Sequence, residues 1–224
     1  MRKVLLFCGI LSSMLYVAMM LVAAMLYEGY SSMSQTVSEL SAIGAPTRPL
    51  WVSLGLIYTL LTFAFGLGIW TSASGSRPLR VVGGLMIAYG VTGLFWPPMH
   101  MRGAEVTLTD TLHIVFTMVT VLLMMLAIGF GAAAFGKRFR LYSIATLMIL
   151  VAFGALTGLD APRVAANLPT PWIGVWERIN IGVYLLWVVV LSATLLRTQL
   201  ELSPDYALTR ATNRPATLSL KSLR

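Results

Sequence analysis

A carboxylate and two histidines lie close together between the third and fourth apolar segments of the chain, at His100, Asp110 and His113. Asp110 and His113 are three residues apart at the start of a predicted helix, so their side chains share one face. A carboxylate beside an imidazole can orient the ring as a metal ligand or fix its tautomer for general-base work. The alternative is structural: Asp110 is a favourable charge at a helix N-terminus, and His113 is a hydrogen-bonded residue between helices.

A divalent-metal site is one chemistry that these residues could support. His100 follows a double proline and would join Asp110 and His113 as the second imidazole of a two-histidine, one-carboxylate site for a metal such as zinc. Cys8 is the single cysteine of the chain. It excludes an intrachain disulfide and any zinc site built on paired cysteines.

A hydroxyl-rich segment at residues 30–48 follows the first apolar run. In an enzyme, Ser38 or Ser41 would be a hydrogen-bond donor or nucleophile and Glu39 a further catalytic candidate. Apolar residues at helical spacing around this segment predict a short interfacial helix that ends at Gly44. The alternative is a solvated connector with one amphipathic turn.

Glu177 and Arg178 form a third polar group, at the start of the last apolar run. Adjacent helical residues point about 100° apart, so these two are not each other's main partner. The expected partners are Arg48 or His113 for Glu177, and Glu39 or Asp110 for Arg178. Either these charges form an ion-pair network that locks the helix ends, or Glu177, Arg48 and Arg178 bind a ligand, with the two arginines holding an anionic headgroup.

Six apolar runs must position these residues. They cover about residues 4–27, 50–70, 81–98, 111–135, 141–159 and 176–196. With 58% hydrophobic and 11% charged residues, the chain has too little polar surface for a water-soluble globule. A spanning helix needs about 20 apolar residues. The sequence therefore predicts an all-α domain of six transmembrane helices at residues 1–198, followed by a disordered cytoplasmic tail at 199–224. The first run is too long for a typical signal-peptide core.

The distribution of charge predicts the orientation of the helices. Of the 16 basic residues, all but four fall on segments that face the cytoplasm if the N-terminus does. The four exceptions are Arg48, Arg102, Arg163 and Arg178. This bias predicts that both ends are cytoplasmic, in a bacterial plasma membrane. The bias also accounts for the net charge of +8, because basic residues on the cytoplasmic side set the topology and attract anionic lipid. The charge therefore does not indicate nucleic-acid binding.

Sequence motifs of common soluble chemistries do not occur in the chain. It has no P-loop, no G-x-G-x-x-G, no G-x-S-x-G and no H-E-x-x-H. Charge is also lacking in the middle of the apolar runs, which argues against an ion pump with a charged relay. Gly154 and Gly158 have the G-x-x-x-G spacing of close helix packing.

The order of these segments resembles the domain of unknown function 998 family of prokaryotic multi-pass membrane proteins. The resemblance covers about residues 1 to 200. It rests on the stretch from Ser34 to Gly44 with Arg48, on Phe95-Trp96-Pro97, on His113, and on Gly174 with Glu177-Arg178. The resemblance implies six helices and an outward-facing polar cluster, and it implies no activity because the family name records none.

Together these patterns predict an outward-facing polar pocket that binds or processes a lipid or small amphiphile. The alternative is a non-catalytic membrane protein, a transporter-like protein or a structural partner of a membrane complex, whose outer charges only clamp the helices. The patterns do not specify whether the protein is an enzyme, its substrate or its oligomeric state.

Overall fold

Helices account for the regular structure of this chain. The computed structural model describes residues 1–201, which contain no β-strand. Its elements are α1 (Arg2–Leu26), the 3-10 helix η1 (Val37–Ser41), α2 (Arg48–Ser72), α3 (Arg77–Leu94), α4 (Leu108–Ala134), α5 (Lys137–Ala165) and α6 (Ile173–Glu201). Each long helix overlaps one predicted apolar run. Most of the predicted tail, residues 202–224, lies outside the described residues.

Proline, serine and glycine mark several of the helix boundaries. Both α2 and α3 have proline in the first turn, where a missing backbone N–H costs nothing. The Ser76 side chain caps α3 by accepting a hydrogen bond from the Leu79 N–H. The turn before it uses Gly75 at a φ of 90°. By contrast, α5 continues through Pro162 to Ala165, beyond the end predicted at residue 159.

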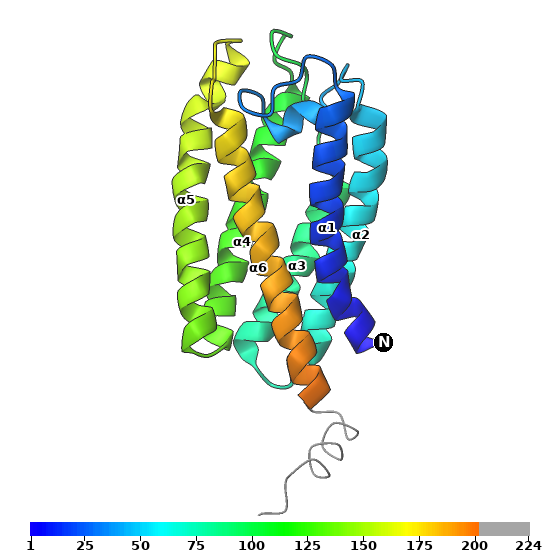
Figure 1. Cartoon of the computed structure of the whole chain (residues 1–224), viewed down its shortest axis with the longest axis vertical. Coiled ribbons are helices and arrows are strands. Elements are labelled where there is room, and N and C mark those ends of the chain that lie inside the picture. Colours follow the sequence, from blue (N-terminus) through cyan, green and yellow to red (C-terminus); the bar gives the residue numbers. More distant parts are fainter. Residues whose placement is uncertain (202–224) are drawn as a thin grey trace, which may run out of the picture.

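The six long helices form a closed ring. Each packs against the next in chain order, and α6 packs against α1 (Figure 1). The loops at 27–47, 95–107 and 166–172 lie at one end of the bundle, and the short turns at 73–76 and 135–136 lie at the other (Figure 1). The three polar groups of the sequence are therefore at the same end, called here the loop end.

Two buried polar side chains of α6 have hydrogen-bond partners on α5. Trp187 Nε1 donates to Ser143 Oγ over 3.0 Å, and Asn180 Nδ2 donates to the Leu150 carbonyl over 2.6 Å. Both bonds join α6 to α5 in a medium that offers no water to replace them. A Cβ at Gly154 would lie 2.9 Å from Nδ2 of the same Asn180, whereas a Cβ at Gly158 would have nothing within 4 Å. Only one glycine of the predicted G-x-x-x-G packing pair thus makes a close contact.

Five of the long helices in residues 1–201 are long and apolar enough to cross a bilayer. The exception is α3, which has 18 residues and carries Arg77 and Arg80 in its first turn. At 1.5 Å per residue it is about 27 Å long, slightly shorter than a typical hydrocarbon core. The structure thus supports an all-helical protein with several membrane-spanning helices, and it leaves the sixth span as a proposal.

Candidate functional site

The first loop folds inward over the bundle. The short helix η1 packs against α1, α2 and α6, and its residues Val37 and Leu40 are buried. The predicted interfacial helix is therefore a 3-10 turn packed on other helices, because its apolar side chains meet the helix ends instead of lipid. Gly44 has a φ of 95°, which suits its expected place at the turn that follows.

A buried ion pair joins this first loop to the second one. Arg102 Nε donates to Glu39 Oε1 over 2.6 Å, and its Nη2 donates to Oε2 over 3.0 Å. Glu39 is 3% exposed. Such a two-point contact fixes both distance and orientation. Glu39, a predicted catalytic candidate, is thus held by a side chain that was not among the predicted ligand-binding residues.

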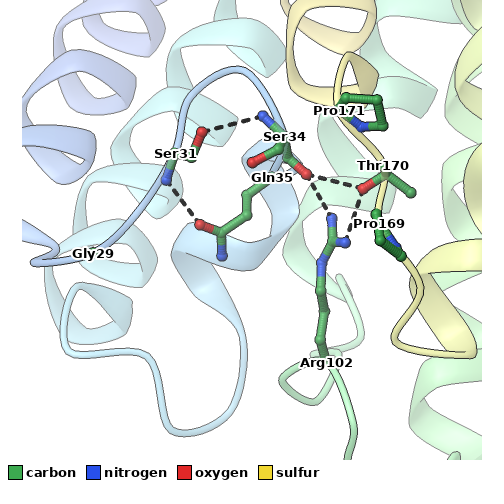
Figure 2. Close-up of a pocket in the computed structure, with 8 residues that line it drawn as sticks. All are labelled: Gly29, Ser31, Ser34, Gln35, Arg102, Pro169, Thr170 and Pro171. Atoms are coloured by element: carbon green, nitrogen blue, oxygen red, sulfur yellow. Dashed lines mark hydrogen bonds between the residues drawn. The ribbon is translucent and has the colours of Figure 1, made fainter.

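Arg102 also reaches the third loop. Its Nη1 donates to Thr170 Oγ1 over 2.8 Å and its Nη2 to the Ser34 carbonyl over 2.9 Å, while Thr170 donates to the same carbonyl (Figure 2). One guanidinium therefore ties all three loops. Beside it lies a cavity of about 330 Å³, lined by Gly29, Ser31, Ser34, Gln35, Arg102, Pro169, Thr170 and Pro171 (Figure 2).

Glu177 binds backbone instead of an arginine. Its Oε2 accepts a hydrogen bond from the Val37 N–H over 2.5 Å. The predicted partners Arg48 and His113 are wrong, because the first loop folds over the start of α6 and offers its backbone there first. Glu177 thus holds the residue that immediately precedes Ser38.

Arg178 likewise bonds to the first loop. Its Nη1 donates to the carbonyls of Ser32, Gln35 and Gly174, and its Nη2 donates to the Tyr30 hydroxyl over 2.5 Å. The predicted partners Glu39 and Asp110 are wrong, since Arg102 and His100 occupy these carboxylates. Burial raises the pKa of Tyr30 to about 12, so its hydroxyl stays protonated and donates to the Thr36 carbonyl.

Ser38 and His113 come from different elements and meet at the loop end. His113 Nε2 lies 3.2 Å from Ser38 Oγ, and His113 Nδ1 lies 2.8 Å from the Pro97 carbonyl oxygen. A carbonyl only accepts, so Nδ1 carries the proton and Nε2 is free to accept from the serine hydroxyl. His113 is 5% exposed, and Ser38 is partly exposed. A serine hydroxyl beside an unprotonated imidazole nitrogen is the contact that a serine nucleophile makes with a general base.

Asp110 is paired with His100 and not with His113. Asp110 Oδ2 lies 2.9 Å from His100 Nδ1, and Oδ1 accepts from the His100 N–H over 2.7 Å. Asp110 also caps α4 by accepting from the Thr107 N–H over 2.8 Å. Sharing a helix face did not bring Asp110 and His113 together, because the turn of the second loop places His100 over the carboxylate. The expected favourable charge at the helix N-terminus is present.

The three predicted metal ligands do not form one set. Among residues 1–201, no three His, Cys, Asp or Glu side chains lie close enough together to hold a metal ion. His113 directs its two nitrogens to Pro97 and Ser38, away from the His100–Asp110 pair. This geometry favours hydrogen bonding over metal ligation at both histidines.

We expect the purified protein to carry no stoichiometric transition metal. Elemental analysis of detergent-purified protein, with His100→Ala and His113→Ala prepared alongside, measures this directly. About one zinc per chain, lost in both variants, would contradict the separated geometry and restore the two-histidine, one-carboxylate site.

Arg48 and Ser41 flank the same turn. Arg48 Nη1 donates to the Ser41 carbonyl over 2.5 Å, and Ser41 Oγ donates to the Ser38 carbonyl over 3.0 Å. Both side chains therefore support the backbone around Ser38. Arg102 and Gly174 both lie against the first loop, and neither was predicted as a site residue. One feature of the sequence pointed to each of them. Arg102 is one of the four basic residues that the charge pattern leaves on the predicted outer segments. Gly174 directly precedes the polar turn of α6.

An all-helical bundle with several apolar helices, whose polar groups gather in loops at one end, defines a multi-pass helical membrane protein. The chain belongs to the family described as protein of unknown function DUF998, whose model matches residues 10–194. The resemblance predicted from the sequence is thus confirmed. Comparisons with curated proteins and with solved structures gave no match.

Proposed function

We propose that this protein processes a lipid or small amphiphile at an outward-facing site on the loop end, with Ser38 as nucleophile and His113 as its base. The observation that carries this proposal is the 3.2 Å contact between Ser38 Oγ and His113 Nε2. The Pro97 carbonyl takes the orienting role that a carboxylate takes in serine hydrolases.

The reaction class that fits this pair is acyl transfer from an ester. Ser38 Oγ would attack the ester carbonyl carbon while its proton passes to His113 Nε2. The carbon–oxygen bond to the alcohol then breaks, and the leaving alcohol takes the proton from Nε2. Water next attacks the acyl-serine, gives a proton to Nε2 and releases the carboxylic acid, after which that proton returns to Ser38 Oγ.

The charged residues would position the nucleophile. Val37 and Glu39 flank Ser38, and each is held by a charged side chain from elsewhere in the chain, Glu177 and Arg102 respectively. Such fixed backbone favours catalysis because little reorganisation is needed in the transition state. Arg48 has one hydrogen bond to a carbonyl and is the arginine best placed to meet an anionic headgroup as well.

A non-catalytic role is the second candidate. It is favoured by the fact that Arg102, Arg178, Glu39 and Glu177 all bind groups of the protein itself. In that case the same contacts only clamp the helix ends. Both candidates place α3 as a sixth span and the loop end outside a bacterial plasma membrane, as the positive charge bias favours.

The test is covalent labelling of Ser38 by a fluorophosphonate, which forms a bond from Oγ to phosphorus with loss of fluoride. We expect intact-mass analysis in detergent to show one adduct per chain, located on Ser38. His113→Gln should slow labelling about a hundredfold, because removing a general base costs on that order. Ser38→Ala should abolish it.

Two neighbouring variants control for indirect effects. Ser41→Ala removes one hydrogen bond to the Ser38 carbonyl but leaves the stronger contacts of Val37 and Glu39 in place. His100→Gln removes the other imidazole of the loop end. Both variants should therefore retain most of the labelling. Unlabelled but folded wild-type protein would contradict the enzyme proposal and leave the non-catalytic role ahead. Equal loss in Ser41→Ala or His100→Gln would show that labelling reports loop integrity instead of the Ser38–His113 pair.

A further inference from the structure

We propose that the substrate reaches the Ser38–His113 pair sideways from the bilayer, past Trp96, so that the substrate is a membrane-resident amphiphile with an acyl chain. This inference rests on the proposed function. It adds the entry route, the residue that forms the lipid-side wall and the class of substrate that this route admits.

Trp96 covers His113 on one side. The two rings meet edge to face with centroids 5.2 Å apart, and Trp96 also contacts Phe116, one turn further along α4, at 6.4 Å. Trp96 itself is 37% exposed. The indole ring of Trp96 thus contacts the proposed base His113 on one side and is exposed at the outer surface of the bundle on the other.

The surroundings at this point are apolar. α3 ends at Leu94, so the wall of the ring continues as the irregular stretch Phe95-Trp96-Pro97-Pro98. Phe95 is 69% exposed, and Leu94 is exposed as well. A partly exposed tryptophan at the end of a spanning bundle belongs in the interfacial layer of a bilayer, beside apolar side chains that face the lipid. Trp96 therefore faces lipid, near headgroup depth.

The adjoining part of α4 has little cover from other helices. From residue 108 to residue 119, His113 is the only buried residue. Ile114, Val115 and Met118 are exposed apolar side chains of this stretch. An acyl chain lying along this face of α4 would keep its ester group at the level of His113 without leaving the membrane.

The aqueous side is more firmly closed. Val37, Glu39 and Leu40, on both sides of Ser38 in the first loop, are buried, and Arg102 ties this loop to the other two loops. Opening from that side would break a buried ion pair and several hydrogen bonds, whereas the lipid side needs only a rotation of one partly exposed side chain. The easier route is thus past Trp96.

Thiol reactivity tests the route without requiring catalysis. Ser38→Cys in a Cys8→Ala background places a single thiol at the site, in lipid nanodiscs of phosphatidylethanolamine and phosphatidylglycerol. Its alkylation is followed by intact mass with dodecyl maleimide, which enters the bilayer, and with a sulfonated maleimide, which does not. Adding Trp96→Ala should raise the dodecyl maleimide rate several-fold and leave the sulfonated rate unchanged.

Matched variants make the result specific. Phe95→Ala removes a more exposed aromatic neighbour that does not touch His113, and Trp96→Phe keeps an aromatic wall, so both should leave the dodecyl rate close to that of the parent. An unchanged dodecyl rate in Trp96→Ala would overturn the lateral route, even if fluorophosphonate labels Ser38. A larger increase with the sulfonated reagent would also overturn it and assign entry to the aqueous side. If wild-type protein is not labelled by fluorophosphonate, but Trp96→Ala still raises the dodecyl maleimide rate of the Ser38→Cys protein, only the enzyme proposal is rejected.

Discussion

Replacing Arg102 with alanine is expected to lower the free energy of unfolding by about 3–5 kcal/mol, the usual cost of leaving one partner of a buried ion pair alone. Glu39 is 3% exposed and would be left without its two-point contact to the guanidinium. The same change removes the bonds to Thr170 and the Ser34 carbonyl. Thermal unfolding of purified protein in detergent, followed by tryptophan fluorescence, measures the loss.

Arg163 offers a matched control at the same end of the bundle. Its Nε lies 3.8 Å from Asp160 in a pair that is 49% exposed on the arginine side, and it also donates to the Pro169 carbonyl. Exposed pairs contribute about 0–1 kcal/mol, so Arg163→Ala should be nearly neutral. Adding Glu39→Gln to Arg102→Ala should recover part of the stability, because the unpaired charge is then gone. Equal effects of Arg102→Ala and Arg163→Ala would refute the three-loop role of Arg102.

Gly174→Ala is the second change with a large expected effect. A Cβ at this position would lie within 3.0 Å of the carbonyl oxygens of Ser32 and Gln35 and of Arg178 Nη1. Two of these atoms belong to backbone that cannot turn aside, and the Gly174 N–H itself donates to the Met33 carbonyl over 2.9 Å. We expect a loss of roughly 3 kcal/mol, at the upper end for overpacking.

The same substitution should also loosen the first loop. Limited proteolysis within residues 30–36 should become faster in Gly174→Ala, because Arg178 and Glu177 hold that loop only while it lies against the start of α6. Gly182→Ala is the control, since Gly182 lies on the same helix and a Cβ there would have nothing within 4 Å. Alanine is a better helix former than glycine by about 1 kcal/mol, so that variant should be unchanged or slightly more stable. Equal proteolysis of the two variants would show that close approach at Gly174 is not what docks the loop.

The Arg102 and Gly174 variants also distinguish the structural role of the loop contacts from the proposed catalytic role of Ser38 and His113. Arg102 and Gly174 do not touch Ser38 Oγ or His113, so their variants act on the enzyme proposal only through the position of η1. Under that proposal, fluorophosphonate labelling should fall together with stability in both. His113→Gln should instead reduce labelling in a protein that remains folded.

Hydropathy and charge along the chain were enough to predict the helical bundle and the grouping of the polar residues. Apolar runs of this length must be helices in lipid, because every backbone group has to be satisfied within its own segment. Successive spanning helices run in opposite directions, so every second loop lies at the same end of the bundle (Figure 1). This places Glu39, His113 and Glu177 at one end. Helix boundaries were less well determined, as α5 shows by continuing through Pro162.

Which of these residues are partners depends on the three-dimensional fold of the loops. Spacing along one helix favoured Asp110 with His113, but the second loop folds back so that His100 takes the carboxylate and leaves His113 to Ser38. Glu177 and Arg178 likewise bind the backbone of a loop that is distant in sequence. Loop conformation depends on contacts made after the helices have packed, and a pattern of residue types does not encode it locally. The hydropathy of this chain therefore determined the bundle, whereas the folding of its loops determined the site.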